Sequence, residues 1–351
     1  MYPYVLAPKL TTAIWGGDGL VERYGKSGDR QQKLGESWEC WDENRVTNGT
    51  MAGRSLAELR AELGAALMGA LDAHRSYPVL TKIIDAHAAL SVQVHPDDAY
   101  AQRVEHEPNG KAECWYVLSA VPGAELVLGW TRDTDREEYA RRVADGSLGD
   151  LLRRVPVHPG DVYYLPAGSL HAIGAGIVVF ETQQTSDLTY RIFDWNRVGA
   201  DGTPRALHID KAADVLDFHG SHAGAIEPLS FVDAGWDRSL LIAAPQFSVE
   251  RVRLRDSAAV RSGSEQSYAL MTLESAVTLE SSGGSVVLAP YETALIPASL
   301  GDVRVGSAAF GAEALIATPD PDIARLRHDA QTAGVTGDQC ARFFPQFVPT
   351  P

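Results

Sequence analysis

The chain is poor in cysteine and in clustered basic residues, and it has no long hydrophobic run. Cys40, Cys114 and Cys340 are an odd number without C-x-x-C spacing, so neither a disulfide framework nor a structural zinc knuckle is expected. No segment approaches the roughly 18 consecutive apolar residues of a membrane span, which excludes a transmembrane protein. The composition, with 45% hydrophobic and 22% charged residues, is typical of a globular protein and excludes intrinsic disorder.

Positive charge is also scarce. The chain has 31 Lys and Arg against 46 Asp and Glu, a net charge of -15, and no basic run dense enough to follow a phosphate backbone. Nucleic acid is therefore not expected as a partner. No basic segment followed by an apolar stretch opens the sequence, so we expect no signal peptide, no membrane partner and a cytoplasmic location. At about 150 residues per domain, the length predicts two domains or one large elaborated domain.

What the sequence does contain is a series of short segments rich in β-branched and aromatic residues and separated by Gly and Pro. This pattern predicts a mainly β fold in which helices are minority elements. The strand candidates are residues 90–96, 114–120, 161–173 and 177–184. One helix is predicted from Ser55, where Ser55 and Glu58 match a capping box, to near His74. A second helix is predicted to begin at Thr134, and a third to span residues 319–334.

Two segments far apart in the chain share a pattern. Residues 160–171 and 291–302 both run from an apolar strand through Pro-Ala into a turn, which predicts two related β units. The first copy ends at His171, whereas the chain has no histidine between His222 and His328. If the copies share a fold, only the first can bind a metal through histidine.

Polar side chains interrupt the apolar strand at 90–96. Because side chains alternate across a strand, Ser91, Gln93 and His95 lie on one face. Glu113 stands at the entry to the next apolar run, and His171 follows a tight turn at the mouth of another strand. Two imidazoles and a carboxylate from separate strands, with a side-chain amide beside them, form a competent ligand set for Zn²⁺.

Each of these residues also has a simpler interpretation. The polar side chains at 91–95 would suit a solvent-exposed strand face, Glu113 and Lys111 would suit a surface ion pair, and His171 would suit a turn. The residues alone leave both interpretations open.

The segment 181–197 carries a second polar cluster that includes two arginines, Arg191 and Arg197. A guanidinium group presents a planar fork that suits phosphate, so this cluster predicts an anionic substrate despite the acidic character of the whole chain. The alternative is a pair of surface arginines that balance Asp187 and Asp194.

Seven motifs in consistent order resemble the type I mannose-6-phosphate isomerases of the cupin superfamily. They are WGG (15–17), GESWE (35–39), LTKIIDA (80–86), LSVQVHPDD (90–98), GKAECWYVL (110–118), PAGSLHAIGAG (166–176) and ETQQTSDLTYRIFDWNR (181–197). The resemblance covers roughly residues 3–220, and the region after 235 is similar to the second, degenerate barrel of the family. It implies two cupin-type (jelly-roll) β-barrels with helical insertions. The implied domains are a catalytic cupin domain (1–220), a second cupin domain (235–320) and a C-terminal helix and tail (321–351).

The resemblance also implies an enzyme that interconverts mannose 6-phosphate and fructose 6-phosphate, with one Zn²⁺ per chain and a sugar phosphate as its small-molecule partner. The implied zinc ligands are Gln93, His95, Glu113 and His171. Lys111 is implied in catalysis, Arg191 in stabilising the developing charge and Asp187 in ring opening. Ser91 and Arg197 match positions that bind the sugar phosphate in the family.

The chemistry of such an enzyme sets two requirements. An aldose and a ketose differ by a proton moved between C1 and C2, so the site needs a base and an electrophile that holds the charge of an enediolate oxygen. Zn²⁺ can supply the electrophile as a Lewis acid. Lys111 and Glu181 both remain open as the base.

Two other functions fit the same residues. Two histidines and a carboxylate also describe the facial triad of a non-haem Fe(II) oxygenase, although Gln93 as a further ligand would take a position that O₂ needs. A metal-dependent protein that binds a sugar phosphate without converting it is the other alternative, and the catalytic side chains implied above argue against it. The sequence leaves the accepted aldose phosphate, the oligomeric state and the role of the second barrel open.

Overall fold

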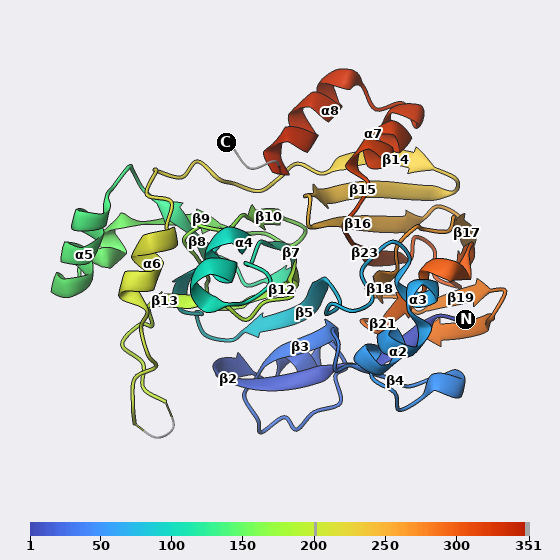
Figure 1. Cartoon of the computed structure of the whole chain (residues 1–351), viewed down its shortest axis with the longest axis horizontal. Coiled ribbons are helices and arrows are strands. Elements are labelled where there is room, and N and C mark those ends of the chain that lie inside the picture. Colours follow the sequence, from blue (N-terminus) through green and yellow to red (C-terminus); the bar gives the residue numbers. More distant parts are fainter. Residues whose placement is uncertain (200–201, 348–351) are drawn as a thin grey trace.

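Strands dominate the structure of the chain. The computed structural model describes residues 1–199 and 202–347, and its strands form sheets of eight, six, five and four strands (Figure 1). Since 38% of the chain is strand and 21% is helix, the prediction of a mainly β fold is confirmed.

The six-stranded and five-stranded sheets form what we call the first sheet pair. The six-stranded sheet has the spatial order β10 (Val162–Leu165), β7 (Glu113–Ala120), β12 (Ile177–Gln184), β5 (Val79–Ala86), β3 (Leu34–Cys40) and β2 (Lys9–Gly17). The five-stranded sheet has the order β13 (Tyr190–Phe193), β6 (Val92–Val94), β11 (His171–Ile173), β8 (Glu125–Trp130) and β9 (Leu152–Pro156). One hydrophobic core contains side chains of both sheets, among them Trp115, Leu128 and Ile173, so the two sheets pack against each other.

The eight-stranded and four-stranded sheets form the second sheet pair. The eight-stranded sheet has the order β14 (Leu229–Asp233), β15 (Trp236–Ala243), β16 (Phe247–Leu254), β23 (Glu313–Pro319), β18 (Tyr268–Thr272), β21 (Thr293–Ile296), β1 (Tyr4–Ala7) and β4 (Arg45–Val46). The four-stranded sheet has the order β17 (Ala258–Arg261), β22 (Val303–Gly306), β19 (Val277–Ser281) and β20 (Gly284–Leu288). Trp236, Leu279 and Val305 belong to the core that these two sheets share.

The beginning of the chain lies in the second sheet pair. Strand β1 runs antiparallel to β21, with Tyr4 opposite Leu295, and β4 pairs with β1. The eight-stranded sheet is therefore completed by residues that precede the first sheet pair in sequence. The domain boundaries expected at residues 220, 235 and 320 stay a prediction.

Helices connect and cover the sheets. They are α1 (Gly19–Glu22), α2 (Leu56–Leu63), α3 (Ala65–Met68), α4 (Asp98–Tyr100), α5 (Arg136–Asp145), α6 (Ile209–Val215), α7 (Ile323–Thr332) and α8 (Gly337–Phe343). Shorter turns of 3₁₀ or π type occupy Gly49–Met51, Ala101–Glu105, Leu148–Leu151, Ala298–Leu300 and Phe344–Phe347.

The first predicted helix begins as expected but is shorter. Ser55 and Glu58 form both hydrogen bonds of the capping box. The helix ends at Leu63 instead of near His74, because the next residue, Gly64, has a positive φ of 50°. The short α3 that follows ends before Gly69, whose φ is 70°. A helix does not continue through a residue in this left-handed region.

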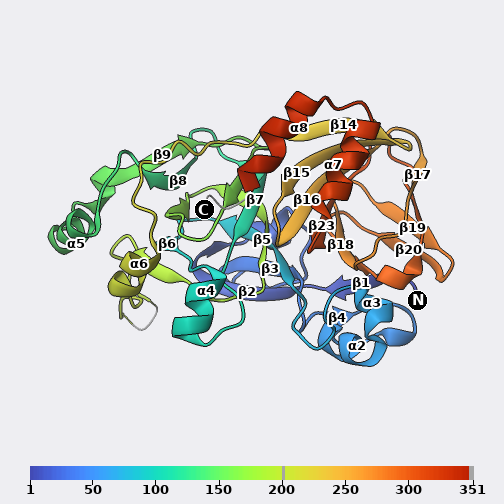
Figure 2. The same cartoon turned by 45° about the horizontal axis from the view of Figure 1, so that its top comes forward.

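The second predicted helix begins one residue later than expected. Asp135, not Thr134, is its N-cap, and the Asp135 carboxylate accepts a hydrogen bond of 2.8 Å from the backbone N–H of Glu138. The third, α7, lies inside the predicted range 319–334, and α7 and α8 lie beside the edge strand β14 (Figures 1 and 2). Residues 348–351 of the predicted tail lie outside the described residues.

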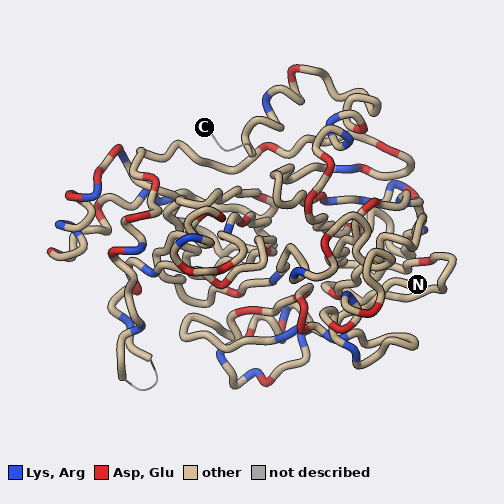
Figure 3. The backbone as a smooth tube through the Cα atoms, viewed as in Figure 1, with Lys and Arg blue, Asp and Glu red and all other residues tan. Residues whose placement is uncertain are grey.

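Charged residues of both signs are mixed along the backbone throughout the fold (Figure 3). Cys40, Cys114 and Cys340 are all free and buried, as expected from their spacing. Within the described parts of the chain, no helix has the length and apolar character needed to cross a membrane.

Candidate active site

The first sheet pair brings a cluster of buried ligand-type side chains together. His95 follows β6, Glu113 begins β7 and His171 begins β11, so the three residues come from both sheets of the pair. Their candidate ligand atoms all lie within 4.8 Å of one another. The predicted convergence of these three residues is therefore present in the fold.

Backbone contacts fix which nitrogen of each imidazole faces the cluster. Nδ1 of His95 lies 2.7 Å from the carbonyl oxygen of Leu188, and Nδ1 of His171 lies 2.9 Å from that of Ser169. Because a carbonyl only accepts, each Nδ1 carries a proton, and in the neutral form of the ring the lone pair is on Nε2. Both Nε2 atoms face Glu113, at 3.5 Å from His95 and 3.1 Å from His171. This is the arrangement of neutral metal-ligating histidines held by backbone carbonyls.

The electrostatics of the cluster favour the same protonation states. Burial, and after it the nearby Lys111 ammonium, lowers the pKa of His95 to about 3. Burial alone would raise the pKa of Glu113, but Lys111 and the two histidines hold it well below its ordinary value. Glu113 is thus a carboxylate, and His95 is neutral near pH 7.

The cluster fits a divalent cation. The Glu113 side chain is fully buried, and neither of its oxygens has a hydrogen-bond partner of good geometry. Buried polar atoms are normally satisfied, so an unsatisfied carboxylate between two imidazole lone pairs points to a missing positive ligand. The Lys111 ammonium, 2.8 Å from Oε2 of Glu113 and 3.4 Å from Nε2 of His95, supplies part of the compensating charge.

Gln93 lies beside this cluster. It is directly opposite His171 in the pairing of β6 with β11, and its amide nitrogen is 3.3 Å from Nε2 of His171. Its amide oxygen accepts a hydrogen bond of 3.4 Å from the Ser91 hydroxyl. The fold therefore places Gln93 at the edge of the candidate metal centre.

A cavity of about 300 Å³ opens next to the cluster. The predicted site residues in its lining are Ser91, Gln93, Lys111, His171, Glu181, Asp187 and Arg191. Asp187 is exposed, and no hydrogen bond or ion pair of its side chain is seen with any of the residues described. Arg191 donates from Nε to the Ser91 hydroxyl at 3.3 Å and from Nη1 to the Ala206 carbonyl at 3.0 Å.

A second row of charges lines the same cavity: the predicted Glu181, and Lys82 and Glu36, which were not predicted. Nζ of Lys82 lies 3.5 Å from Oε2 of Glu36 and 3.4 Å from Oε2 of Glu181. Each carboxylate also accepts a hydrogen bond from an indole N–H, Glu36 from Trp38 at 2.6 Å and Glu181 from Trp115 at 2.9 Å. The available signal was a lysine inside the apolar strand LTKIIDA, because a buried lysine requires acidic partners.

The pKa values of the two acids in this row, Glu181 and Glu36, shift in opposite directions. Burial raises the pKa of Glu181, and the Glu113 carboxylate adds to the rise, while Lys82 opposes it. Burial also acts to raise the pKa of Glu36, but Lys82 and the Trp38 hydrogen bond outweigh it, so this pKa is lowered. Lys82 itself has a raised pKa, since Glu36 and Glu181 outweigh the effect of burial. Glu181 therefore has the greater proton affinity of the two acids.

The two arginines that follow β13 differ in position. Arg197, which was predicted to bind substrate, is absent from the cavity lining and instead bonds to the Asp194 carboxylate and the Ala89 carbonyl. Arg205, which was not predicted, lines the cavity and pairs with the same Asp194 at 2.6 Å. Arg191 and Arg205 are thus the arginines of this cavity lining.

Comparison with known proteins agrees with this geometry. Residues 4–119 match the family model described as phosphomannose isomerase type I, catalytic domain. A mannose-6-phosphate isomerase of Streptococcus mutans is 40% identical over 260 residues, which cover 73% of this chain and 80% of that protein. The chain belongs to the type I phosphomannose isomerase family. Another similar protein, a mannose-6-phosphate isomerase of Bacillus subtilis, is 38% identical over 272 residues, 74% of this chain and 82% of that protein.

Solved structures of phosphomannose isomerases share the fold. A crystal structure of the mannose 6-phosphate isomerase from Bacillus subtilis superimposes with a TM-score of 0.83 at 30% identity, over 91% of this chain and 100% of that chain. A variant of the phosphomannose isomerase from Salmonella typhimurium has a TM-score of 0.73 at 18% identity, over 92% of this chain and 100% of that chain, which shows likeness of fold alone. The resemblance drawn from the motifs is confirmed, and with it a cupin fold, while the number of barrels stays a prediction.

Proposed function

We propose that this chain interconverts mannose 6-phosphate and fructose 6-phosphate with the help of one bound Zn²⁺. The observation that carries the proposal is the buried cluster of His95, Glu113 and His171. It adjoins a cavity that is lined by His171 together with Lys111 and Arg191. The relatives named above bear this activity in their names. A free sugar phosphate as substrate also fits the cytoplasmic location expected from the sequence.

In this proposal the three clustered residues hold the metal, with Gln93 as a fourth ligand. Gln93 presents its amide nitrogen to His171, so it would ligate through oxygen after its amide group turns over. Two imidazoles, a carboxylate and an amide oxygen suit zinc among the common divalent ions. When bound, Zn²⁺ supplies Lewis-acid stabilisation of negative charge on a substrate oxygen.

We assign the proton transfers of the reaction to Glu181 and Lys111. Glu181 is a buried carboxylate with a raised pKa and an oxygen, Oε2, that lacks a hydrogen-bond partner, so we assign it as the base that takes the proton from C2. Glu181 then delivers that proton to C1. Lys111, in ion-pair contact with Glu113 at 2.8 Å, moves the other proton: it gives one to the oxygen on C1 and takes one back from the oxygen on C2, so that both groups end as they began.

The remaining predicted residues orient the sugar phosphate. Arg191 holds the charge that develops on the substrate oxygen, because its guanidinium is fixed by Ser91 and a backbone carbonyl while it lines the cavity. Ser91 contributes a hydroxyl to the same wall, and Asp187 assists ring opening. Arg205, and Arg197 behind it, provide positive charge for the phosphate group.

Elemental analysis of the purified protein combined with a coupled assay for fructose 6-phosphate tests the proposal. We expect close to one zinc per chain, loss of turnover after chelation and recovery with Zn²⁺. His171→Ala is expected to lose metal and turnover, whereas His222→Ala, which removes an exposed histidine outside the cluster, is expected to keep both. Full turnover after verified metal removal would refute the mechanism.

The same protein sample separates the two alternatives. A non-haem Fe(II) oxygenase would consume O₂ with Fe(II) and give no isomerisation, and membership of the isomerase family argues against it. A binding protein without activity would bind mannose 6-phosphate and leave it unconverted in the coupled assay.

A further inference from the structure

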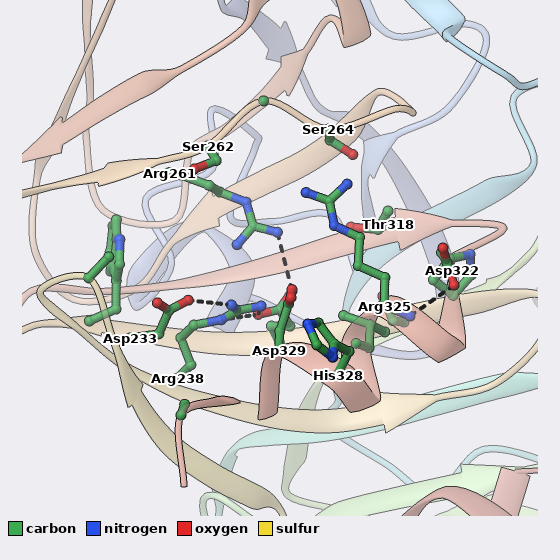
Figure 4. Close-up of a pocket in the computed structure, with 18 of the residues that line it drawn as sticks. Asp233, Arg238, Arg261, Ser262, Ser264, Thr318, Asp322, Arg325, His328 and Asp329 are labelled. Atoms are coloured by element: carbon green, nitrogen blue, oxygen red, sulfur yellow. Dashed lines mark hydrogen bonds and ion pairs between the residues drawn. The ribbon is translucent and has the colours of Figure 1, made fainter. Parts of the chain in front are cut away.

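The second sheet pair has a pocket of its own. Its volume is about 550 Å³, larger than the 300 Å³ of the candidate active site, and within the range of sites that bind small molecules. Strands β14 to β17, the loop 262–266 and helix α7 line it (Figure 4). No residue of the proposed isomerase site belongs to this lining.

The floor of this pocket is a buried charge network. Glu250 of β16 is 2% exposed and pairs with Arg238 of β15 at 2.8 Å and with Arg261 of β17 at 3.2 Å. Arg238 also pairs with Asp233 at 2.8 Å. Burial alone would raise the pKa of Glu250, but Arg261 and Arg238 lower it to about 2.

The network parallels the candidate metal centre. In each sheet pair a buried glutamate of the larger sheet faces a side chain of the smaller sheet, His171 opposite Glu113 in the first pair and Arg261 opposite Glu250 in the second. Guanidinium groups that already neutralise the glutamate leave no role for a metal cation. The second pair therefore has no counterpart of the candidate metal centre at this position.

Two guanidinium groups of the lining keep unpaired donors among the described residues, since Arg325 has no side-chain partner and Arg261 uses only Nη2 for its pair with Glu250. Arg325 of α7 is exposed, and its side chain has no ion pair or hydrogen bond with any residue the structure describes. Figure 4 shows it extending from the helix toward Ser264, with Arg261 on the same side of the pocket. Arg261 is held in place by Glu250 and by the ring of Tyr268, 4.9 Å from its guanidinium carbon. Two arginines that line one pocket favour the binding of an anion there.

Five carboxylates belong to the lining, and none of them pairs with the Arg325 guanidinium: Asp233, Glu250, Glu265, Asp322 and Asp329. Glu265 is exposed. Asp233 and Glu250 are neutralised by the floor network. Asp322 caps helix α7 by accepting a hydrogen bond of 2.9 Å from the backbone N–H of Arg325. Asp329 lies on α7, one turn after Arg325, and the Arg325 guanidinium points away from it in Figure 4.

We propose that this pocket binds a small organic anion whose phosphoryl or carboxylate group lies between Arg261 and Arg325. The hydroxyls of Ser262 and Ser264, in the loop beside the two guanidinium groups, are placed to donate to the same group (Figure 4). The pocket volume admits a metabolite-sized molecule in addition to the anionic group. This site is independent of the proposed isomerase activity.

Calorimetric titration of the zinc-loaded full chain tests the site, with inorganic phosphate, citrate and mannose 6-phosphate as separate probes. We expect at least one probe to bind to the wild type. Arg325→Ala is expected to raise the Kd of that probe by roughly tenfold or more, because the substitution removes charge-assisted hydrogen bonds. Arg325→Lys, which keeps the charge but loses the planar fork, is expected to restore part of the affinity. Inorganic phosphate and citrate distinguish a phosphoryl group from carboxylate, and mannose 6-phosphate shows whether the substrate itself is the ligand.

Arg327→Ala is the matched control. It removes the same charge from the same helix, but Arg327 lies over the Phe344 ring and outside the pocket lining, so its titrations are expected to match the wild type. Arg261→Met provides a second variant in case one arginine suffices. The proposal is overturned if all three probes give the same titrations with the wild type, Arg325→Ala and Arg261→Met. Isomerase turnover is assayed in parallel, because failure of the pocket leaves that activity intact.

Discussion

At the scale of single residues, Arg197 and Arg205 provide a direct test of which side chain binds the phosphate. Both pair with Asp194, but only Arg205 lines the cavity. We therefore predict that Arg205→Ala raises KM for mannose 6-phosphate by about tenfold, the cost of a charge-assisted contact, while Arg197→Ala changes it by less than about threefold. Steady-state kinetics of the two variants measure this difference.

The two substitutions control for each other, because each removes one ion pair to the same carboxylate. Equal unfolding temperatures would show that the kinetic difference is not a loss of stability. The reverse order of KM values would assign the phosphate contact to Arg197, as the sequence predicts.

Lys82 gives a prediction about pH dependence. Its ammonium opposes the rise in the pKa of Glu181 that burial and Glu113 cause. If Glu181 is the base, kcat/KM falls as the pH drops through the pKa of Glu181, because the protonated acid cannot take a proton. Lys82→Met removes the opposing charge, so we expect the acidic limb of the kcat/KM profile to move to higher pH.

Lys82→Arg is the control for this experiment, since it keeps a positive charge between Glu36 and Glu181 and is expected to leave the acidic limb near its original place. Circular dichroism of both variants checks that they fold, because a buried lysine with two acidic partners also affects stability. An acidic limb that stays in place in Lys82→Met would exclude Glu181 as the titrating base.

The site residues differ in how much of their role can be inferred from the chain alone. Alternation along one strand places Gln93 and His95 on a common face, and the ligand chemistry then singles out Glu113 and His171. The role of Lys82 cannot be inferred from alternation of polar and apolar residues, because its strand is buried at every position. Its partner Glu181 is 99 residues away and becomes its direct neighbour only when β12 pairs with β5. Pairing between distant strands is what local sequence patterns do not contain.

At the scale of single elements, the start of α5 is a case in which the backbone, not the residue type, selects the cap. Thr134 and Asp135 are both good N-cap residues, but Asp135 accepts the hydrogen bond from the Glu138 backbone. The Thr134 hydroxyl donates instead to the Glu138 side chain at 3.0 Å. We predict that Asp135→Ala lowers the free energy of unfolding by about 1 kcal/mol and that Thr134→Ala lowers it by less.

Urea unfolding followed by circular dichroism measures both variants. Asp135→Asn, which keeps a capping side chain, is expected to stay within about 0.5 kcal/mol of the wild type. Equal losses for Thr134→Ala and Asp135→Ala would contradict the assignment of Asp135 as the cap.

Element type is better encoded in this sequence than element length. The apolar, β-branched runs at 114–120 and 177–184 match strands β7 and β12 almost residue for residue. The helix predicted to reach His74 ends at Leu63, where Gly64 takes a positive φ. The sequence does not reveal this end, because the residue types at Gly64 and Gly69 permit a left-handed turn but do not require one. Glycine is tolerated inside a helix at a cost of about 1 kcal/mol, so its conformation depends on the packing around it.

At the scale of the whole molecule, the two sheet pairs are joined by a buried polar network. Lys26 and Glu39 are both buried and form an ion pair of 2.7 Å. The Lys26 ammonium also donates to the Tyr291 carbonyl at 2.7 Å, and Glu39 accepts from the Thr293 hydroxyl at 3.2 Å. Since Glu39 lies in β3 of the first sheet pair and Thr293 in β21 of the second, the network crosses the boundary between them.

The N-terminal strand connects the pairs in a second way that no local pattern indicates. Strand β1, residues 4–7, is hydrogen bonded to β21, almost 290 residues later in the chain. The second sheet pair is therefore complete only with residues from the start of the chain. The whole chain, not a fragment ending near residue 220, is thus the unit whose stability should be measured.

This coupling predicts that breaking the buried ion pair destabilises the whole chain. Lys26→Met leaves the Glu39 carboxylate buried without its partner charge, which costs about 3–5 kcal/mol. The double variant Lys26→Met/Glu39→Gln removes both charges and is expected to recover part of this loss. Lys9→Met is the control, because its pair with Glu43 is as short, 2.7 Å, but exposed, and such pairs contribute about 0–1 kcal/mol. Denaturant unfolding followed by tryptophan fluorescence measures all three variants. A loss for Lys26→Met no greater than that for Lys9→Met, or a double variant less stable than Lys26→Met, would show that this pair does not hold the two sheet pairs together.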